Sequence, residues 1–258
     1  MILDDIVSKT KERYMDKIKN IEKIKEMASQ REISNPNFFY DAIKKKGISF
    51  ICECKKASPS KGIISEDFPY LDIALEYNKC ADVISCLTEP YYFLGKDEYL
   101  TNIKNAVSIP VLRKDFILFE YQIYEAKAIG ADAILLIVAI LTDEELQNYL
   151  NLAHSIGLGV LVETHDEDEM NRAIKAGAKV LGVNNRNLKD FTVDVANSID
   201  LRKNAPSDIM FVSESGIKTR EDIVKLEENN VDAVLIGETL MRSNNIKDMV
   251  SLLKYGKN

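Results

Sequence analysis

Short apolar runs alternate along most of this chain with longer segments in which apolar residues recur at helical spacing. The runs are rich in β-branched residues and have the length of buried strands. Most of them begin roughly 20–30 residues apart, which is the span of one strand and one helix. The predicted strands are Ile48–Cys54, Val83–Leu87, Val111–Lys114, Ala133–Ile137, Gly159–Glu163, Val180–Asn184, Ile209–Ser213 and Ala233–Ile236.

Start and stop signals support helices between these strands. Thr142-Asp-Glu-Glu145 and Thr219-Arg-Glu-Asp222 resemble capping boxes, which begin helices. Gly130, Gly177 and Asn230 stand where a helix should end and the next strand begin. Strict alternation of strands and helices favours a closed parallel barrel over an open sheet. The expected fold is therefore α/β, a (β/α)8 TIM barrel.

The first 47 residues precede the first predicted strand. Apolar and small residues at helical spacing from Leu3 to Tyr14 predict an extra N-terminal helix, packed across one end of the barrel. Residues 36–43 could form a second short helix, and the apolar side chains of both are interpreted as packing. The chain is expected to be a single domain over 1–258, with a helical extension at 1–47 and the barrel at 48–258.

Composition narrows the function classes. A length of 258 residues suits one α/β barrel. The net charge of −7 and the pI near 5.1 argue against nucleic acid as the main partner. The longest apolar run, Ala133 to Leu141, is too short for a bilayer, and the N-terminus becomes acidic too early for a signal peptide. We expect a cytoplasmic enzyme with neither a membrane nor a nucleic-acid partner.

The cysteines and histidines do not suggest a metal site. Cys52-x-Cys54 is not a zinc spacing, so Cys52, Cys54, Cys80 and Cys86 are interpreted as buried thiols. His154 and His165 are the only histidines in the chain, which makes a histidine-rich metal centre improbable on composition. The expected metal content is none.

Charge at the end of the first predicted strand is the strongest sign of chemistry. Side chains alternate along a strand, so Glu53 and Lys55 share one face while Cys52 and Cys54 share the other. Charges on a buried face are costly unless they are paired or used. A carboxylate and an ammonium beside the Ser58–Gly62 loop therefore indicate the wall of an active site.

The other strand ends carry similar residues. In a parallel barrel the carboxyl ends of all strands meet at one mouth. The polar candidates there are Glu53, Lys55, Lys114, Glu163, Asn184, Arg186 and Glu214, whereas the fourth strand ends without charge and would form an apolar wall. Two lysines and three glutamates at one mouth can shift one another's pKa values, which suits acid–base catalysis near neutral pH.

Glycines after the last two strands indicate a phosphate site. Ser215-Gly216 follows the seventh strand and Gly237-Glu238 follows the eighth. In many barrels these two loops bind phosphate through backbone N–H groups, and glycine lets the backbone approach closely. Simple turn glycines are the plainer alternative.

Taken together, these motifs resemble indole-3-glycerol phosphate synthase over nearly the whole chain. The matching segments are Ile2-Leu-Asp-Asp-Ile-Val7, Glu53-Cys-Lys-Lys-Ala-Ser-Pro-Ser60, Leu87-Thr-Glu89, Tyr92-Phe-x-Gly95, Pro110-Val-Leu-Arg-Lys-Asp-Phe-Ile117, Val162-Glu-Thr-His165, Gly182-Val-Asn-Asn-Arg-Asn-Leu188, Val212-Ser-Glu-Ser-Gly-Ile217 and Leu235-Ile-Gly-Glu238. The resemblance implies conversion of 1-(2-carboxyphenylamino)-1-deoxyribulose 5-phosphate into indole-3-glycerol phosphate, carbon dioxide and water. It implies no metal or organic cofactor.

The resemblance also implies catalytic roles. Lys114 would be the general acid at the carbonyl, and Glu163 the general base or its partner in dehydration. Lys55, held by Glu53, would bind substrate and could be the acid of the second step. Glu214 would tune the lysines or bind a substrate hydroxyl. How acid steps divide between Lys55 and Lys114 stays open.

The remaining implied roles concern binding. Asn184, counted with the catalytic residues, and Arg186 would hold the carboxylate and hydroxyl side of the substrate. Ser58 and Leu188 would contact substrate, and Phe93 and Phe116 would pack on its aromatic ring. Ser215, Gly216, Gly237 and Glu238 would bind phosphate. The implied partner is a small phosphorylated molecule, and the expected state is a monomer, open to weak association with other pathway enzymes.

Two positions depart from the family pattern. Lys96 stands where members often have serine, and Glu238 stands where some have serine, so a hydroxyl contact to phosphate could be missing. The Ser58–Gly62 loop is expected to close over substrate.

Other readings remain open at this point. They are another phosphate-binding barrel, such as phosphoribosylanthranilate isomerase or the tryptophan synthase α subunit, a Schiff-base aldolase that uses Lys114 or Lys55, and a barrel without catalysis. The isomerase would need a Cys/Asp pair where Glu53 and Glu163 stand.

Overall fold

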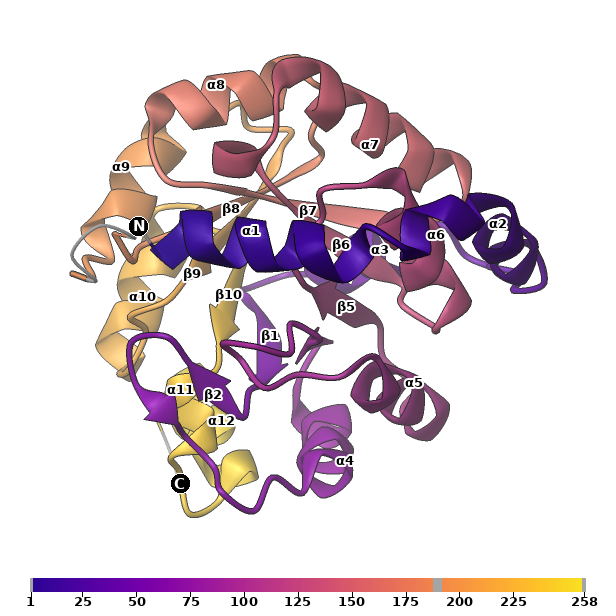
Figure 1. The fold of residues 1–258 in the computed structure, drawn as a ribbon. Helices are drawn as coiled ribbons and strands as arrows, with labels where there is room; N and C mark the ends of the chain where they lie inside the picture. The colour runs from indigo at the N-terminus through magenta and orange to yellow at the C-terminus, as the bar shows by residue number, and fades with distance from the viewer. Residues whose placement is uncertain (1, 188–191, 257–258) are drawn as a thin grey trace.

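The computed structural model describes residues 2–187 and 192–256. Within these residues a closed barrel of parallel strands has the order β1-β10-β9-β8-β7-β6-β5-β4 (Figure 1), which confirms the predicted fold class. Its strands are β1 Ser49–Cys54, β4 Val83–Leu87, β5 Val111–Lys114, β6 Ala133–Ile137, β7 Gly159–Thr164, β8 Val180–Asn184, β9 Met210–Glu214 and β10 Ala233–Ile236. A small antiparallel hairpin, β2 Ala57–Ser58 and β3 Gly62–Ile63, follows β1.

Helices surround the barrel and connect successive strands. On the outside lie α4 Tyr70–Cys80, α5 Asp97–Ala106, α6 Glu120–Ala128, α7 Asp143–Ser155, α8 Glu167–Lys175, α9 Ala196–Asn204, α10 Arg220–Glu228 and α12 Ile246–Tyr255. Two short elements follow strands at the mouth, η2 Val138–Ile140 and α11 Glu238–Met241. The N-terminal extension contains α1 Ile2–Tyr14, η1 Lys17–Asn20, α2 Ile21–Ser29 and α3 Phe38–Ile43.

Three predicted strands had boundaries that were wrong by one residue, the seventh at both ends. The first strand begins at Ser49, the fifth reaches Thr164, and the seventh runs from Met210 to Glu214. Strand ends depend on pairing with neighbours, and the Asn184–Glu214 register keeps Glu214 within β9. The place of Glu214 inside β9 matters because a side chain within a strand points to a fixed face of the sheet.

Alternation along the strands separates two apolar layers. Ile51, Leu112 and Leu161 belong to the layer inside the barrel, whereas Phe50 and Cys52 belong to the layer between strands and helices. Glu53 therefore points inward and Cys54 outward, as predicted. Cys52, Cys54 and Cys86 are buried, but Cys80 is only half-buried, which corrects that part of the prediction, and all are free thiols.

The predicted helix signals have the expected geometry. Thr142 and Thr219 each cap a helix and close a capping box with the acidic residue three positions later. Gly130, Gly177 and Asn230 have positive φ angles of 107°, 91° and 57°, the left-handed conformation that ends a helix. These local contacts set the spacing of the strand ends that form the site.

The N-terminal extension covers both ends of the barrel. Helix α1 crosses the mouth formed by the carboxyl ends of the strands (Figure 1), as predicted. Helix α3 closes the opposite end, where Phe39 and Tyr40 pack with the inner apolar layer. Helix α2 packs on α6 and was missed, although Ile24 and Ala28 recur at helical spacing on its buried side.

A buried ionic network attaches α1 to the barrel. The Arg113 guanidinium points out of the barrel and contacts Asp115 and Glu125, which lies 2.9 Å away. Arg13 lies 2.7 Å from Asp115, and the Tyr14 hydroxyl donates to Glu125 at 2.5 Å. Removing one partner of such a network costs about 3–5 kcal/mol, so the network holds α1 over the mouth.

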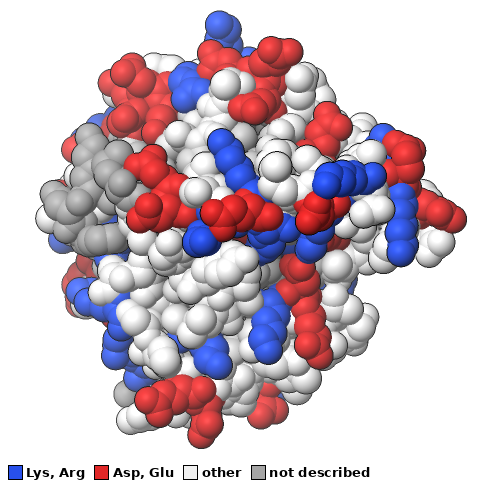
Figure 2. Space-filling view, in the orientation of Figure 1, with Lys and Arg blue, Asp and Glu red and all other residues white. Residues whose placement is uncertain are grey.

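The surface of this face carries both signs of charge. Figure 2 shows Lys and Arg side chains interspersed with Asp and Glu side chains over α1 and its surroundings.

Among the helices of the described residues, none is long and apolar enough to cross a bilayer.

Candidate active site

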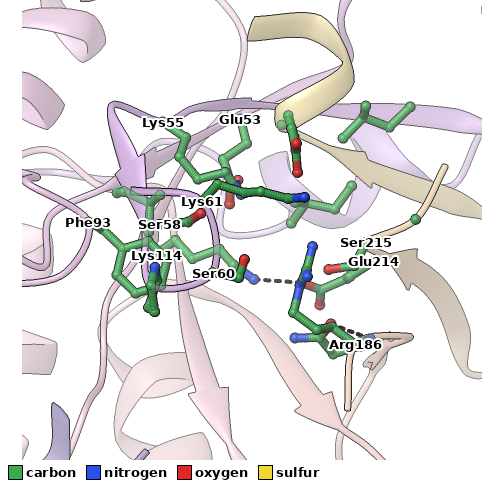
Figure 3. Close-up of a pocket in the computed structure, with 18 of the residues that line it drawn as sticks. Glu53, Lys55, Ser58, Ser60, Lys61, Phe93, Lys114, Arg186, Glu214 and Ser215 are labelled. Atoms are coloured by element: carbon green, nitrogen blue, oxygen red, sulfur yellow. Dashed lines mark hydrogen bonds and ion pairs between the residues drawn. The ribbon is translucent and has the colours of Figure 1, made fainter. Parts of the chain in front are cut away.

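A cavity of about 540 Å³ lies at the mouth of the barrel, and we call it the mouth cavity (Figure 3). Its volume is in the range of small-molecule sites. The predicted site residues that line it are Glu53, Lys55, Ser58, Phe93, Lys114, Phe116, Glu163, Asn184, Arg186, Glu214, Ser215, Gly216, Gly237 and Glu238. Leu188 lies outside the described residues. The structure thus brings together every predicted site residue that it describes.

Lys114 lies between two carboxylates. Its Nζ is 2.6 Å from Glu214 Oε2 and 3.1 Å from Glu163 Oε2. Asn184 donates from Nδ2 to the other oxygen of Glu163 at 3.2 Å. These residues come from the adjacent strands β7, β8 and β9 and from β5, so the barrel alone sets their spacing.

Burial and charge act in opposite directions on this cluster. Burial would lower the pKa of Lys114, but the Glu214 and Glu163 carboxylates raise it above its usual value, so Lys114 stays protonated. Burial would raise the pKa of Glu163, but Lys114, His165 and the Asn184 hydrogen bond lower it below 4.5. Burial dominates for Glu214 and raises its pKa to about 7. The cluster therefore contains a stable cation, a stable carboxylate and a group that titrates near neutral pH.

Glu214 should make folding stability depend on pH. Its pKa is about 7 in the folded barrel and near 4.5 when unfolded, so the stability of the folded state falls as pH rises between these values. Glu214→Gln removes this effect and should raise Tm at pH 8 by roughly 3–6 °C relative to the parent. The difference should shrink toward pH 5 in scanning calorimetry. An equal difference at both pH values would show that Glu214 does not titrate in this range.

The first strand contributes a separate pair. Lys55 Nζ lies 2.5 Å from Glu53 Oε2, which confirms that the two charges at the end of β1 are paired. Gly237 stands next to this pair, and a Cβ there would collide with Glu53 Oε2. A Cβ at Gly182 would likewise collide with Glu214 Oε1. Gly182, within β8, and Gly237, just after β10, thus provide room for the buried carboxylates.

An apolar slot lies on the β4 and β5 side of the mouth. The Phe93 and Phe116 rings are 6.2 Å apart at an angle of 37°. The Glu89 carboxylate accepts hydrogen bonds from the backbone N–H groups of Tyr91, Tyr92 and Phe93. Glu89, which belongs to the Leu87-Thr-Glu89 segment of the family resemblance, therefore orders the loop that presents Phe93.

The glycine turns lie in another sector of the mouth, after β9 and β10. Ser215 and Gly216 have positive φ angles of 68° and 85°. Asn185 Nδ2 donates to the Ser215 carbonyl oxygen at 3.1 Å and helps hold this strained turn. A non-glycine residue with such a φ angle costs about 1–3 kcal/mol and is often found at ligand sites.

Several cavity residues were not predicted from the sequence. Lys61, whose side chain extends into the cavity in Figure 3, Lys218 and Arg242 add positive charge. The Glu238 carboxylate lies 3.1 Å from Arg242 Nε. Arg242 stands four residues after Glu238, at the end of α11, and this spacing in the sequence could have predicted the pair. Ile2, Leu3 and Ile6 line the cavity as well, which corrects the interpretation of the α1 apolar residues as packing alone.

The comparisons with known proteins agree with these residues. A family model described as indole-3-glycerol phosphate synthase matches residues 3–253. The chain belongs to the indole-3-glycerol phosphate synthase family. This confirms the resemblance seen in the sequence motifs and leaves the rival barrel families without support.

Individual relatives of the same name are close in sequence and length. The indole-3-glycerol phosphate synthase of Ruminiclostridium cellulolyticum is 54% identical over 250 residues, covering 94% of this chain and 95% of the relative. That of Endomicrobium trichonymphae is 54% identical and covers 98% of this chain and 100% of the relative.

Solved structures with low sequence identity share the fold. A 3-hexulose-6-phosphate synthase has a TM-score of 0.66 at 16% identity, covering 82% of this chain and 100% of its own. A tryptophan synthase α-subunit from a hyperthermophile, Pyrococcus furiosus, has a TM-score of 0.60 at 16% identity, covering 80% and 97%. At this identity the likeness concerns the barrel alone.

Proposed function

We propose that this chain converts 1-(2-carboxyphenylamino)-1-deoxyribulose 5-phosphate into indole-3-glycerol phosphate, carbon dioxide and water. The observation that carries the proposal is the Lys114 ammonium between the Glu163 and Glu214 carboxylates. The family to which the chain belongs has the name of this reaction's product. The same cavity is lined by the Phe93–Phe116 ring pair and, after β9 and β10, by the glycine turns with Lys218 and Arg242.

Ring closure needs an acid at the ketone. An aromatic carbon attacks the ketone carbon while Lys114 donates a proton to the ketone oxygen, and loss of carbon dioxide follows. Lys114 suits this step because its two carboxylate neighbours keep it protonated and fix its position. Preorganised charge of this kind needs no rearrangement when the oxygen becomes negative.

Dehydration needs a departing hydroxyl and a base. Glu163, whose pKa is lowered, is ionised and accepts the final proton. Lys55, fixed by Glu53, is the candidate that protonates the leaving hydroxyl, and Lys114 is the alternative donor. Glu214 tunes the charge of Lys114 or contacts a substrate hydroxyl.

The two anionic ends of the substrate need anchors. Arg186 and Asn184 line the cavity and are proposed to hold the carboxylate and hydroxyl side, and Ser58 and Leu188 remain proposed substrate contacts. Backbone groups of Ser215, Gly216, Gly237 and Glu238 are proposed to bind the phosphate. Phe93 and Phe116 are placed to pack on the aromatic ring.

Arg242 is proposed to complete the phosphate site, since this chain has Glu238 where some members of the family have serine. Loss of a charge-assisted hydrogen bond costs about 1.5–3 kcal/mol, so Arg242→Ala should raise KM roughly 10-fold with little change in kcat. It should also weaken competitive inhibition by inorganic phosphate. The matched control is Arg172→Ala, because Arg172 pairs with Asp143 outside the cavity. Unchanged KM and phosphate inhibition would remove Arg242 from the site.

The direct test uses the purified chain and the carboxyphenylamino-deoxyribulose phosphate, with indole fluorescence as the readout. Product should form, and a metal chelator should not change the rate. Absence of product from the folded protein would contradict the proposed function. The monomeric state and the cytoplasmic location, together with closure of the Ser58–Gly62 loop, remain predictions from the sequence.

A further inference from the structure

His165 lies directly behind the proposed base and has no role in the reaction described above. It follows β7 at once, and its backbone N–H donates to Glu169 Oε2 at 2.9 Å. The same oxygen lies 3.0 Å from His165 Nδ1. A carboxylate oxygen can only accept, so Nδ1 carries a proton and the direction of the ring is fixed.

The other ring nitrogen faces Glu163. His165 Nε2 is 3.6 Å from Glu163 Oε1, on the side of that carboxylate away from Lys114. Nε2 is fully buried and has no hydrogen-bond partner among the residues that the structure describes. A buried nitrogen that makes no hydrogen bond and lies this close to a carboxylate can donate to it once it carries a proton.

The charges around the imidazole come from several elements. Glu163 on β7 and Glu169 on α8 face it directly, and the Glu214 carboxylate on β9 adds a weaker attraction. Lys114 on β5 lies on the far side of Glu163. Burial would lower the pKa of His165, but the three carboxylates outweigh it and the pKa is raised above 6.5.

We propose that His165 is a positioning residue for Glu163, oriented by Glu169, and that its protonation state decides whether it can hold that carboxylate. This inference rests on the proposed role of Glu163 as the base. With His165 protonated, Nδ1–H is bonded to Glu169 and Nε2–H can donate to Glu163 Oε1, which fixes the direction of that carboxylate. With His165 neutral, the proton stays on Nδ1 and Nε2 has none to donate, so turnover should fall as pH rises through the titration of His165.

A spectroscopic measurement tests the coupling without any assay of activity. The chain has only two histidines, and His154→Asn assigns their NMR signals, since His154 contacts Tyr40 at the closed end of the barrel. Removing either carboxylate, in Glu163→Gln or Glu169→Gln, should lower the pKa of His165 by about one pH unit. An unchanged value in Glu163→Gln would overturn the proposal.

Kinetics then test the role in turnover. His165→Ala should lower kcat about 10- to 100-fold with KM nearly unchanged, because His165 is not part of the cavity wall. His165→Gln should recover part of kcat by placing an amide near Oε1, but its kcat–pH profile should lack the step of the parent. His154→Asn should keep both the rate and the step. If His165→Gln keeps the parental rate and step, the proposal is overturned.

The two possible failures are distinguishable. If the NMR coupling is present but Glu163→Gln turns over at the parental rate, the assignment of Glu163 as base is wrong, and the role of His165 in turnover is overturned with it. If Glu163→Gln is inactive and His165→Ala is fully active, only the positioning role is overturned. The NMR comparison needs no His165 variant, so it holds even if those variants fold poorly.

Discussion

Lys114→Met should lower kcat by a factor of roughly 10²–10⁴ while substrate binding is largely retained. Lys114 is the cation between Glu163 and Glu214 and is the proposed donor of a proton to the ketone. Methionine keeps most of the apolar stem and removes the ammonium. The measurement is kcat and KM from indole fluorescence, with binding checked by titration of the substrate into the inactive variant.

The control for Lys114 must separate chemistry from stability. Glu163 and Glu214 lose their cation in the variant, and Glu214 should then take up a proton more readily, so folding is compared by thermal unfolding at pH 6. Lys218→Met is the matched variant, because Lys218 also lines the mouth cavity but follows the Ser215–Gly216 turn on the proposed phosphate side. It should raise KM and leave kcat nearly intact. A kcat for Lys114→Met within a few-fold of the parent would remove Lys114 from the acid role.

Glu163→Gln should lower kcat by roughly 10²–10³ at all pH values, because an amide cannot accept the proton released in dehydration. The pKa of Glu163 is lowered, so the base itself stays ionised throughout the neutral range, and the step in kcat expected there belongs to His165. Glu163→Asp keeps the charge and shortens the reach, and it should recover part of the rate.

A single-turnover experiment assigns Glu163 to a step. If Glu163 acts in dehydration, Glu163→Gln should release carbon dioxide faster than it forms indole, so the ring-closed intermediate accumulates. Lys114→Met should be slow in both carbon dioxide release and indole formation, since Lys114 is proposed to act in ring closure. Carbon dioxide and indole appearing together in Glu163→Gln would place the defect before decarboxylation and contradict the dehydration role.

Local patterns predicted the strands well because short contacts decide them. Five of the eight predicted strands have the boundaries seen in the structure, and the errors elsewhere are one residue at one end or, for the seventh strand, at both ends. The capping boxes at Thr142 and Thr219 are complete within four residues, so the sequence displays all their parts. Helix α2 was missed because its extent depends on packing against α6, which is distant in the sequence.

The site residues were predictable because the barrel repeats one rule. Every strand ends at the same mouth, so a charged residue at a strand end is placed there whatever its number. Arg113 and Asp115 flank Lys114 in sequence, but the Arg113 side chain points outward into the network that holds α1. Cavity residues such as Lys61 and Arg242 lie on loops and a short helix after the strands, where the direction of a side chain has no simple period.

By itself, the sequence determined the alternation of strands and helices, the inward face of each strand and the residue types at the mouth, because these follow from hydrophobic period and local turn chemistry. Tertiary structure decided which charges meet. Lys114 and Glu214 are 100 residues apart, and only closure of the barrel brings them to 2.6 Å. It also decided the pKa of Glu214, since burial and the neighbouring charges exist only in the folded chain.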